Sequence, residues 1–317
     1  MQGFYKVLSL LVLATLLSAC ASSGKFPITE SQLGEYDFSK PELIELGKLV
    51  EVAYTIFRGD EAEANPPFPV PFQTGFKPIR NLQGRDNPKD ATAEFYGHLS
   101  WKENEPKTLV ITIRGTSDAQ EWLDDFKFSK VWYSDNEDYG HVEKGFHEIF
   151  QTFTVSVPGE TETQALNDYL AVLEGVEKVI VVGHSLGSSL ATLVAFEANL
   201  LAHANKTELL TFASPLTGDK RFVNAFQTRI VDAVRMVNRP DLVPRVPPKL
   251  FGFRHIWHEL EYDSHPNPYI KNSVGCYHSL LTYLHLLDSS ICLESKCGTD
   301  EYWANYPECP SDLTVSK

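Results

Sequence analysis

Basic residues are scarce in this sequence. Its 317 residues include 28 lysines and arginines against 42 aspartates and glutamates, which gives a formal net charge of −14 at pH 7. No stretch gathers basic residues into the stripe that would neutralise nucleic-acid phosphates. A net negative charge is also repelled by anionic lipid headgroups. The composition therefore argues against nucleic acid as a partner, and against protein charge as the means of holding the chain at a membrane.

Long hydrophobic runs are also scarce. The apolar segment of residues 7–17 is too short to span a bilayer as an ordinary helix. It leads into LSAC at residues 17–20, which resembles a bacterial lipobox, with small residues before a cysteine. The resemblance implies a signal peptide over residues 1–19, cleavage before Cys20 and lipid attachment to its thiol. An ordinary secretory signal with an incidental cysteine is the alternative, and both interpretations predict export.

The residue after the cysteine bears on the destination. Ala21, where an aspartate would be the contrasting signal, resembles outer-membrane sorting in enteric-type bacteria. We therefore expect a lipoprotein held in the outer membrane of a Gram-negative bacterium by acyl chains on Cys20, with residues 20–38 as a tether. Residues 39–317 are expected to form one domain with a cysteine-containing C-terminal tail, because no repeat, low-complexity tract or long linker divides them. The sequence makes no prediction of oligomeric state.

Cysteine is rare outside the C-terminal region. The four cysteines after Cys20 are Cys276, Cys292, Cys297 and Cys309. An oxidising compartment favours two disulfides, and four cysteines allow three pairings. We expect Cys292–Cys297 as a local loop and Cys276–Cys309 as a clamp on the tail. Metal binding is the alternative, disfavoured because no second close pair of ligands is present.

The most informative segment covers residues 178–196, KVIVVGHSLGSSLATLVAF. A continuous β-branched run leads into GHSLG and then into a helix of small residues. So tight a turn between strand and helix needs glycine two residues before and two after the serine. This turn exposes the serine hydroxyl beyond the end of the strand. It also points the N–H groups at the helix N-terminus toward an oxyanion that develops on a bound substrate. The segment therefore predicts a nucleophile elbow with Ser185 as the nucleophile; an inert serine in a glycine-bounded turn is the alternative.

Helical and strand patterns alternate along the rest of the chain. Ser39 and Glu42 form a capping box, with Pro41 in the first turn of a helix that extends through Phe57. A proline-rich loop is expected over residues 66–76. Strands are predicted over residues 95–101, 107–113, 179–182, 209–213 and 233–237, and helical spacing recurs over 166–173. This alternation predicts a mostly parallel central sheet flanked by helices. Together with the serine elbow, it resembles the α/β-hydrolase fold.

A serine nucleophile needs a histidine base and an orienting carboxylate, and in this fold the chain order is Ser, acid, His. Asp241 follows the predicted strand at 233–237 and is the predicted acid. Its alternative role is to form a turn beside Pro240. The competing carboxylates are Asp219, Asp232 and Asp263.

His278 is the predicted base. It lies at an expected junction between loop and helix, where a base can reach the end of a strand, whereas His285 falls among core leucines. A structural histidine is the alternative. The other downstream histidines are His203, His255, His258 and His265. A zinc site at His255, His258 and Glu259 is disfavoured, because these residues are expected to alternate on a strand and lack an evident third ligand.

Together these motifs resemble the fungal-type class 3 lipase family of α/β hydrolases, from about Phe95 to Leu284. The matching elements are IRGT at residues 113–116, GHSLG at 183–187, TFASP at 211–215 and an acid loop of the form N-x-x-D-x-V-P-x-x-P-P at 238–248. His141 with Gly145-Phe146 resembles the family's H-x-G-F element in position, although Val142, Glu143 and Lys144 separate the histidine from the glycine. The chain departs from the family at Ser188 and Ser189, where Gly and Ala are usual, and at Ala213, where glycine is common. All three residues are small, so the departures bear on substrate fit more than on catalysis.

The resemblance implies a role for each matched residue. Ser185 is the implied nucleophile, Asp241 the orienting acid and His278 the general base and acid. Thr116 and Leu186 are the implied oxyanion-hole donors. Residues 117–128 align with the family's lid, where Trp122, Leu123 and Phe126 share one face and carboxylates occupy the other. We expect a lid this polar to give weak interfacial activation.

The predicted protein is a serine hydrolase that cleaves carboxylic esters of lipids, as an acylglycerol lipase or esterase, without a metal or cofactor. One alternative is phospholipase A1 or lysophospholipase activity on envelope lipids. The other is a lipoprotein that keeps a hydrolase scaffold without catalysis, because a fold alone does not prove activity. The presence of candidates for all three triad roles argues against this second alternative.

Overall fold

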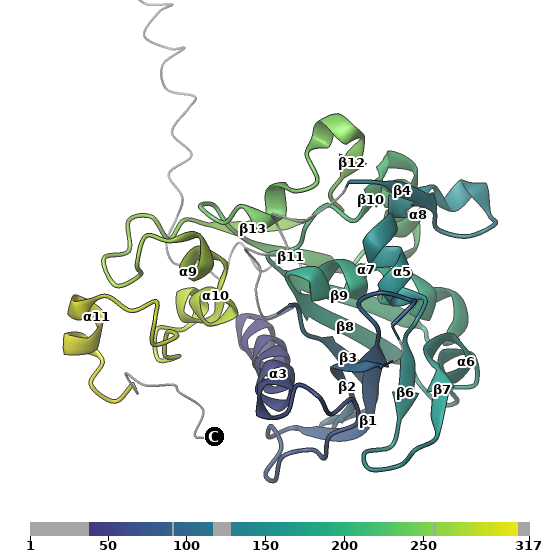
Figure 1. The fold of residues 1–317 in the computed structure, drawn as a ribbon, viewed down its shortest axis with the longest axis horizontal. Helices are drawn as coiled ribbons and strands as arrows, with labels where there is room; N and C mark the ends of the chain where they lie inside the picture. Colours follow the sequence, from purple (N-terminus) through teal and green to yellow (C-terminus); the bar gives the residue numbers. More distant parts are fainter. Residues whose placement is uncertain (1–37, 91, 117–127, 257, 310–317) are drawn as a thin grey trace, which may run out of the picture.

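A nine-stranded sheet forms the centre of the computed structural model, which describes residues 38–90, 92–116, 128–256 and 258–309 (Figure 1). In spatial order its strands are β13 (Glu259–Tyr262), β11 (Ala233–Asn238), β9 (Lys206–Phe212), β8 (Lys178–His184), β3 (Glu105–Ile113), β2 (Glu94–Lys102), β1 (Phe76–Gly84), β6 (Thr154–Ser156) and β7 (Thr163–Ala165). From β13 to β3 neighbouring strands are parallel, and from β3 to β7 they are antiparallel.

The parallel register determines where the loops meet. Ile113 of β3 lies opposite Gly183 of β8, and Gly183 lies opposite Thr211 of β9. The carboxyl ends of these strands therefore lie at one edge of the sheet, which is where α/β proteins build their sites.

Strand β8 is buried on both faces, which explains its unbroken β-branched sequence. Val179 and Val181 contribute to the hydrophobic core on one face, and Ile180 and Val182 to the core on the other. Because successive side chains of a strand point to opposite faces, a strand between two helical layers needs apolar residues at every position.

Helices cover both faces of the sheet (Figure 1). One layer holds α3 (Lys40–Gly59), α9 (Val274–His278), α10 (Leu280–Leu287) and α11 (Asp300–Asn305), and the other holds α5 (Lys144–Phe150), α6 (Leu166–Ala171), α7 (Leu186–Leu201) and α8 (Lys220–Arg229). A smaller sheet beside α8 is formed by β12 (Phe253–Arg254), β10 (Gly218–Asp219), β5 (His141–Glu143) and β4 (Lys130–Trp132). The predicted α/β-hydrolase fold is confirmed.

Helix α3 begins where its cap predicts. The Ser39 hydroxyl accepts a hydrogen bond from the Glu42 N–H at 3.4 Å. The Glu42 carboxylate accepts from Lys102 Nζ at 2.7 Å, so it also ties the helix to strand β2. The helix continues two residues past the predicted end at Phe57.

Two features of the strands differ from the sequence prediction. Strand β1 was not predicted, because its sequence FKPIRNLQG holds a proline and little alternation; Pro78 lies at an irregularity in its pairing with β2. His255 and His258 lie between β12 and β13 rather than alternating on one strand, and His258 has a φ of 60°. In the described residues no group of three or more His, Cys, Asp or Glu side chains is arranged to hold a metal ion.

No helix within the described ranges is long and apolar enough to cross a bilayer. Residues 1–37, which contain the predicted signal peptide, Cys20 and most of the tether, lie outside those ranges.

The predicted disulfide pairing is wrong. The bonds are Cys276–Cys297 and Cys292–Cys309. The Lys271 N–H donates to the Cys297 carbonyl at 2.9 Å, which holds Cys297 beside the start of α9, where Cys276 lies. Helix α11 then returns the chain, so that Cys309 reaches Cys292. Both bonds therefore follow from the packing of the tail rather than from spacing along the chain.

Burial of His98 on strand β2 predicts a pH-dependent stability. Burial lowers the pKa of His98 to about 4, whereas an unfolded histidine titrates near ~6.5. In this pH range the unfolded chain therefore binds a proton on His98 that the folded chain does not bind. The free energy of unfolding falls as the pH drops below the pKa of the unfolded histidine. Between pH ~7.5 and ~5, the wild type should lose about 2 kcal/mol of unfolding free energy relative to His98→Gln. Urea unfolding at both pH values measures this difference, and parallel pH profiles for the two proteins would contradict the assignment.

Candidate active site

Ser185 lies between strand β8 and helix α7 in a backbone conformation that non-glycine residues rarely adopt, with φ 58° and ψ −130°. The glycines on either side have no room for a side chain. A Cβ on Gly183 would lie 2.3 Å from the Gly187 carbonyl oxygen, and one on Gly187 would lie 2.4 Å from the Arg114 carbonyl oxygen. The helix thus crosses the end of β3 at backbone contact, which explains the spacing of GHSLG.

Three side chains predicted from chain order form one hydrogen-bonded series. His278 Nε2 lies 2.8 Å from Ser185 Oγ, and His278 Nδ1 lies 2.8 Å from Asp241 Oδ2. All three residues are buried. Because the carboxylate can only accept, Nδ1 carries the imidazole proton and Nε2 is left to accept the serine hydroxyl proton.

Asp241 is held by two further donors. Its Oδ1 accepts from the Val243 N–H at 3.0 Å, and its Oδ2 accepts from the Tyr283 hydroxyl at 2.8 Å. Burial, followed by the charge of Asp241, raises the pKa of Tyr283 well above its ordinary value, so the phenol stays protonated. The Tyr283 oxygen in turn accepts from the Asn238 N–H at 3.0 Å. The carboxylate is therefore fixed in orientation on both oxygens.

The competing carboxylates have other partners. Asp219 caps helix α8 and contacts His141, Asp232 pairs with Lys206, and Asp263 pairs with Arg239 and His265.

The remaining histidine candidates also lie elsewhere. His285 contacts the Ile291 carbonyl, His255 contacts the Pro244 carbonyl, and His203 follows the end of α7. His141 stacks on Trp132 with ring centroids 3.7 Å apart.

A second polar network runs behind the series. The Tyr54 hydroxyl lies 2.8 Å from His184 Nδ1, and its oxygen accepts from the Gly115 N–H at 2.9 Å. His184 Nε2 lies 2.8 Å from the His278 carbonyl oxygen. Since a carbonyl only accepts, Nε2 carries the proton and Nδ1 accepts from Tyr54. Burial, and then the proximity of His278, lowers the pKa of His184 well below its ordinary value, so the ring stays neutral.

The predicted oxyanion donors lie at the two sides of the serine. Leu186 is the first residue of α7, so its N–H has no acceptor one turn earlier in the helix. Thr116 follows Gly115, where an added Cβ would lie 2.9 Å from the Ser185 Cβ. Within the described residues the buried Thr116 Oγ1 has no hydrogen-bond partner. The predicted lid residues Trp122, Leu123 and Phe126 lie outside the described ranges.

The departures from the family pattern fit locally. The Ser188 hydroxyl donates to the Gly183 and Phe212 carbonyls, both at 2.8 Å. The Ser189 hydroxyl accepts from Thr217 at 3.0 Å. Ala213 has a φ of 55°, which accounts for glycine being common at that position.

Tyr54, His184 and Tyr283 are site residues that the sequence prediction missed. Tyr54 and Tyr283 carried only the signal of a buried helix face, and His184 stood within GHSLG without a predicted partner. Tyr54 and His184 are 130 positions apart, so no local pattern connects them.

Several known proteins have sequences similar to this chain. Residues 110–251 match the family model described as lipase (class 3). Phospholipase A1-II 5 of Oryza sativa subsp. indica is 30% identical over 204 residues, covering 56% of this chain and 44% of that protein. Secreted mono- and diacylglycerol lipase 1 of Fusarium solani is 29% identical over 164 residues, covering 52% and 46%. The chain thus spans about half the length of these relatives.

Solved structures give the same fold. The Rhizomucor miehei lipase propeptide complex superposes with a TM-score of 0.54 at 24% identity, covering 83% of this chain and 80% of that one. The architecture and the serine elbow are those of the α/β-hydrolase fold. Within this fold, the match to the class 3 lipase family model covers residues 110–251, and the similar proteins carry lipase or phospholipase A1 names.

Removing the Tyr54 hydroxyl should disturb both ends of the second network. Tyr54→Phe leaves the Gly115 N–H and His184 Nδ1 without their buried partner, so we expect a loss of about 1–3 kcal/mol in stability. Labelling of Ser185 by a fluorophosphonate should slow by about tenfold or more, because His278 loses alignment.

Tyr262→Phe is the matched control. In the described part of the chain the buried Tyr262 hydroxyl has no hydrogen-bond partner, so its removal should leave stability and labelling unchanged. Equal effects of the two substitutions would contradict a positioning role for Tyr54.

The two disulfides close loops of similar length, with sequence separations of 21 and 17. Replacing either pair by alanine should therefore cost a similar amount, about 3 kcal/mol. Only Cys276 lies two residues from His278, so only loss of the Cys276–Cys297 bond should slow fluorophosphonate labelling in protein that is still folded. Thermal melts and labelling rates of the two double variants test this, and equal slowing in both would overturn it.

Proposed function

We propose that this chain is a serine hydrolase that cleaves carboxylic esters of lipids, with Ser185, His278 and Asp241 as its catalytic residues. The observation that carries the proposal is the buried series from Ser185 Oγ through His278 to Asp241, with both distances at 2.8 Å. Nucleophile, base and orienting carboxylate have the geometry that acyl transfer requires.

The geometry supports a two-step reaction. His278 Nε2 takes the Ser185 proton as Oγ attacks the ester carbonyl, and Asp241 stabilises the imidazolium. N–H groups at Leu186 and Thr116 would donate to the oxyanion. His278 then protonates the departing alcohol, which leaves an acyl group on Ser185. Water, deprotonated by His278, attacks the acyl-enzyme and releases the fatty acid.

Two substrate classes are supported. The relatives include proteins named as a mono- and diacylglycerol lipase and as phospholipases A1. Acylglycerols or simple esters are our first proposal. Phospholipid cleavage by phospholipase A1 or lysophospholipase activity is the second, supported by relatives named as phospholipases A1.

We also propose that the protein is exported and held at the outer membrane of a Gram-negative bacterium by acyl chains on Cys20, after removal of residues 1–19. Two disulfides support passage through an oxidising compartment. The Fusarium solani relative is named as secreted. Metabolic labelling with a radioactive fatty acid, compared between wild type and Cys20→Ser, tests the anchor, and equal incorporation would refute it.

Hydrolysis of p-nitrophenyl esters of increasing acyl length tests the proposed activity. Ser185→Ala should lower kcat by at least about 10⁴-fold, because the nucleophile is lost. Ser189→Ala is the matched control, since it removes a buried hydroxyl one helical turn away, and it should keep near wild-type activity. The acyl-length profile separates esterase from lipase, and only a modest rise in rate is expected above the solubility limit of the substrate.

Phospholipid vesicles provide the second substrate in the same assay. Release of fatty acid from vesicles, without p-nitrophenyl ester hydrolysis, would favour the phospholipase A1 proposal. If Ser185→Ala matches the wild type on every substrate, the proposed chemistry is wrong.

A further inference from the structure

The segment after the acid loop carries an exposed apolar surface. Leu250 is 91% exposed, Phe251 49% and Leu242 44%, although most large apolar side chains of the described residues are buried. Leu250 and Phe251 belong to a short 3-10 turn, Lys249–Phe251, between β11 and β12. That segment projects from the sheet beside the β12 label in Figure 1.

Four cations surround this turn. They are Lys130, Arg245, Lys249 and Arg254, all exposed. We call these residues, with Leu242, Leu250 and Phe251, the tip surface. Arg254 Nη1 donates to the Lys249 carbonyl at 3.1 Å, and Lys130 Nζ lies 5.0 Å from the Phe253 ring centroid. The cations therefore lie around the same turn.

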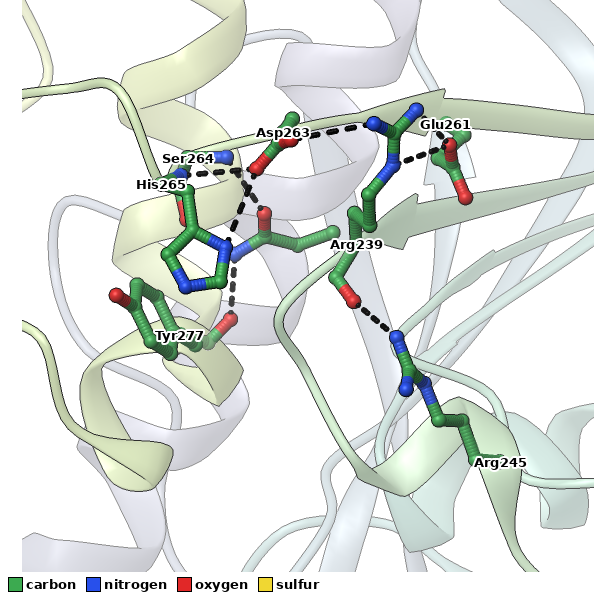
Figure 2. Close-up of polar contacts among 8 residues, drawn as sticks. Arg239, Arg245, Glu261, Asp263, Ser264, His265 and Tyr277 are labelled. Carbon is green, nitrogen blue, oxygen red and sulfur yellow. Dashed lines mark hydrogen bonds and ion pairs between the residues drawn. The ribbon is translucent and has the colours of Figure 1, made fainter. Parts of the chain in front are cut away.

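These cations are not neutralised by acidic side chains. Arg245 donates to the Arg239 carbonyl at 2.7 Å, as Figure 2 shows. Among the described residues, none of the four cations forms an ion pair with a carboxylate. A molecule with 42 acidic and 28 basic residues thus presents a local positive surface.

The nearby acids are already paired. Glu261 binds Arg239 at 2.6 Å and Glu259 binds Arg235 at 2.7 Å. Asp263 also pairs with Arg239, on the side away from Arg245 in Figure 2. A pocket of about 290 Å³ opens beside Arg245 and Lys249, and its lining also includes the paired carboxylates Glu259 and Glu261.

The tip surface adjoins the candidate active site. Leu242 directly follows the buried Asp241, so the two share one loop. Phe251 packs on Phe128, with ring centroids 5.3 Å apart. A lipid surface that bound this tip would therefore lie close to the acid loop.

We propose that the tip surface docks the protein onto lipid bilayers that carry anionic headgroups. Leu250 and Phe251 enter the headgroup region, and Arg245, Lys249 and Arg254 contact phosphates. Apolar side chains ringed by cations bind such interfaces through burial and electrostatic attraction together. The inference rests on the proposed function, since it names the surface from which lipid would reach Ser185.

The test uses tryptophan as a depth probe in the full chain carrying Cys20→Ser, so that acyl chains cannot anchor it to the vesicles. Leu250→Trp is placed in a Ser185→Ala background, so that hydrolysis cannot alter the vesicles. Quenching by brominated lipids is compared on phosphatidylcholine vesicles with and without phosphatidylglycerol. Val231→Trp is the matched control, because Val231 is 66% exposed but precedes β11, at the opposite end of that strand from Leu242.

On vesicles that contain phosphatidylglycerol, we expect stronger quenching of Leu250→Trp than of Val231→Trp. Quenching of Leu250→Trp should be weaker on vesicles without phosphatidylglycerol. Adding Arg245→Gln, Lys249→Gln and Arg254→Gln should raise the lipid concentration needed for half-maximal quenching by about 100-fold, which is roughly fivefold for each cation removed. A thermal melt checks that this variant still folds.

Two results would overturn the proposal. One is quenching at position 250 no greater than at 231. The other is equal quenching on both vesicle types that survives the glutamine substitutions, which would indicate apolar insertion without anionic recognition. Neither depends on catalysis, so failure of the ester assay and failure of the docking proposal are distinguishable.

Discussion

The backbone contact between helix α7 and the end of strand β3 is the constraint on which the site depends. Any side chain at Gly187 would collide with the Arg114 carbonyl at 2.4 Å. Because the helix starts so close to the sheet, Ser185 takes a positive φ and stands at the carboxyl edge, beside Gly115. The nucleophile, the helix N-terminus and the strand end that leads to Thr116 therefore come together through one close approach.

Buried polar networks then fix the groups that the backbone does not. Asp241 accepts hydrogen bonds from Val243 and Tyr283. The His278 ring donates to Asp241, and the His278 carbonyl accepts from His184. A buried polar group without a partner is costly, so satisfied networks of this kind favour a single arrangement. Here the same contacts that stabilise the loops also align the candidate base.

The sequence predicted those parts of the site that local chemistry dictates. The elbow could be recognised because its glycines are needed by backbone geometry, and Asp241 and His278 because the fold fixes their chain order. The disulfide pairing could not be predicted, because it depends on how the tail packs beside α9. The role of Tyr54 could not be predicted either, because its partners His184 and Gly115 are distant in the sequence. Net charge concealed the tip surface, because a sum over the chain does not show where the cations gather.

The most direct test of the account is mass spectrometry of the protein quenched during turnover of a slowly deacylating ester. If Ser185, His278 and Asp241 act as one unit, an acyl group should accumulate on the peptide that contains Ser185, and Asp241→Asn should suppress its formation. An adduct on another residue, or turnover without any adduct, would contradict the central claim.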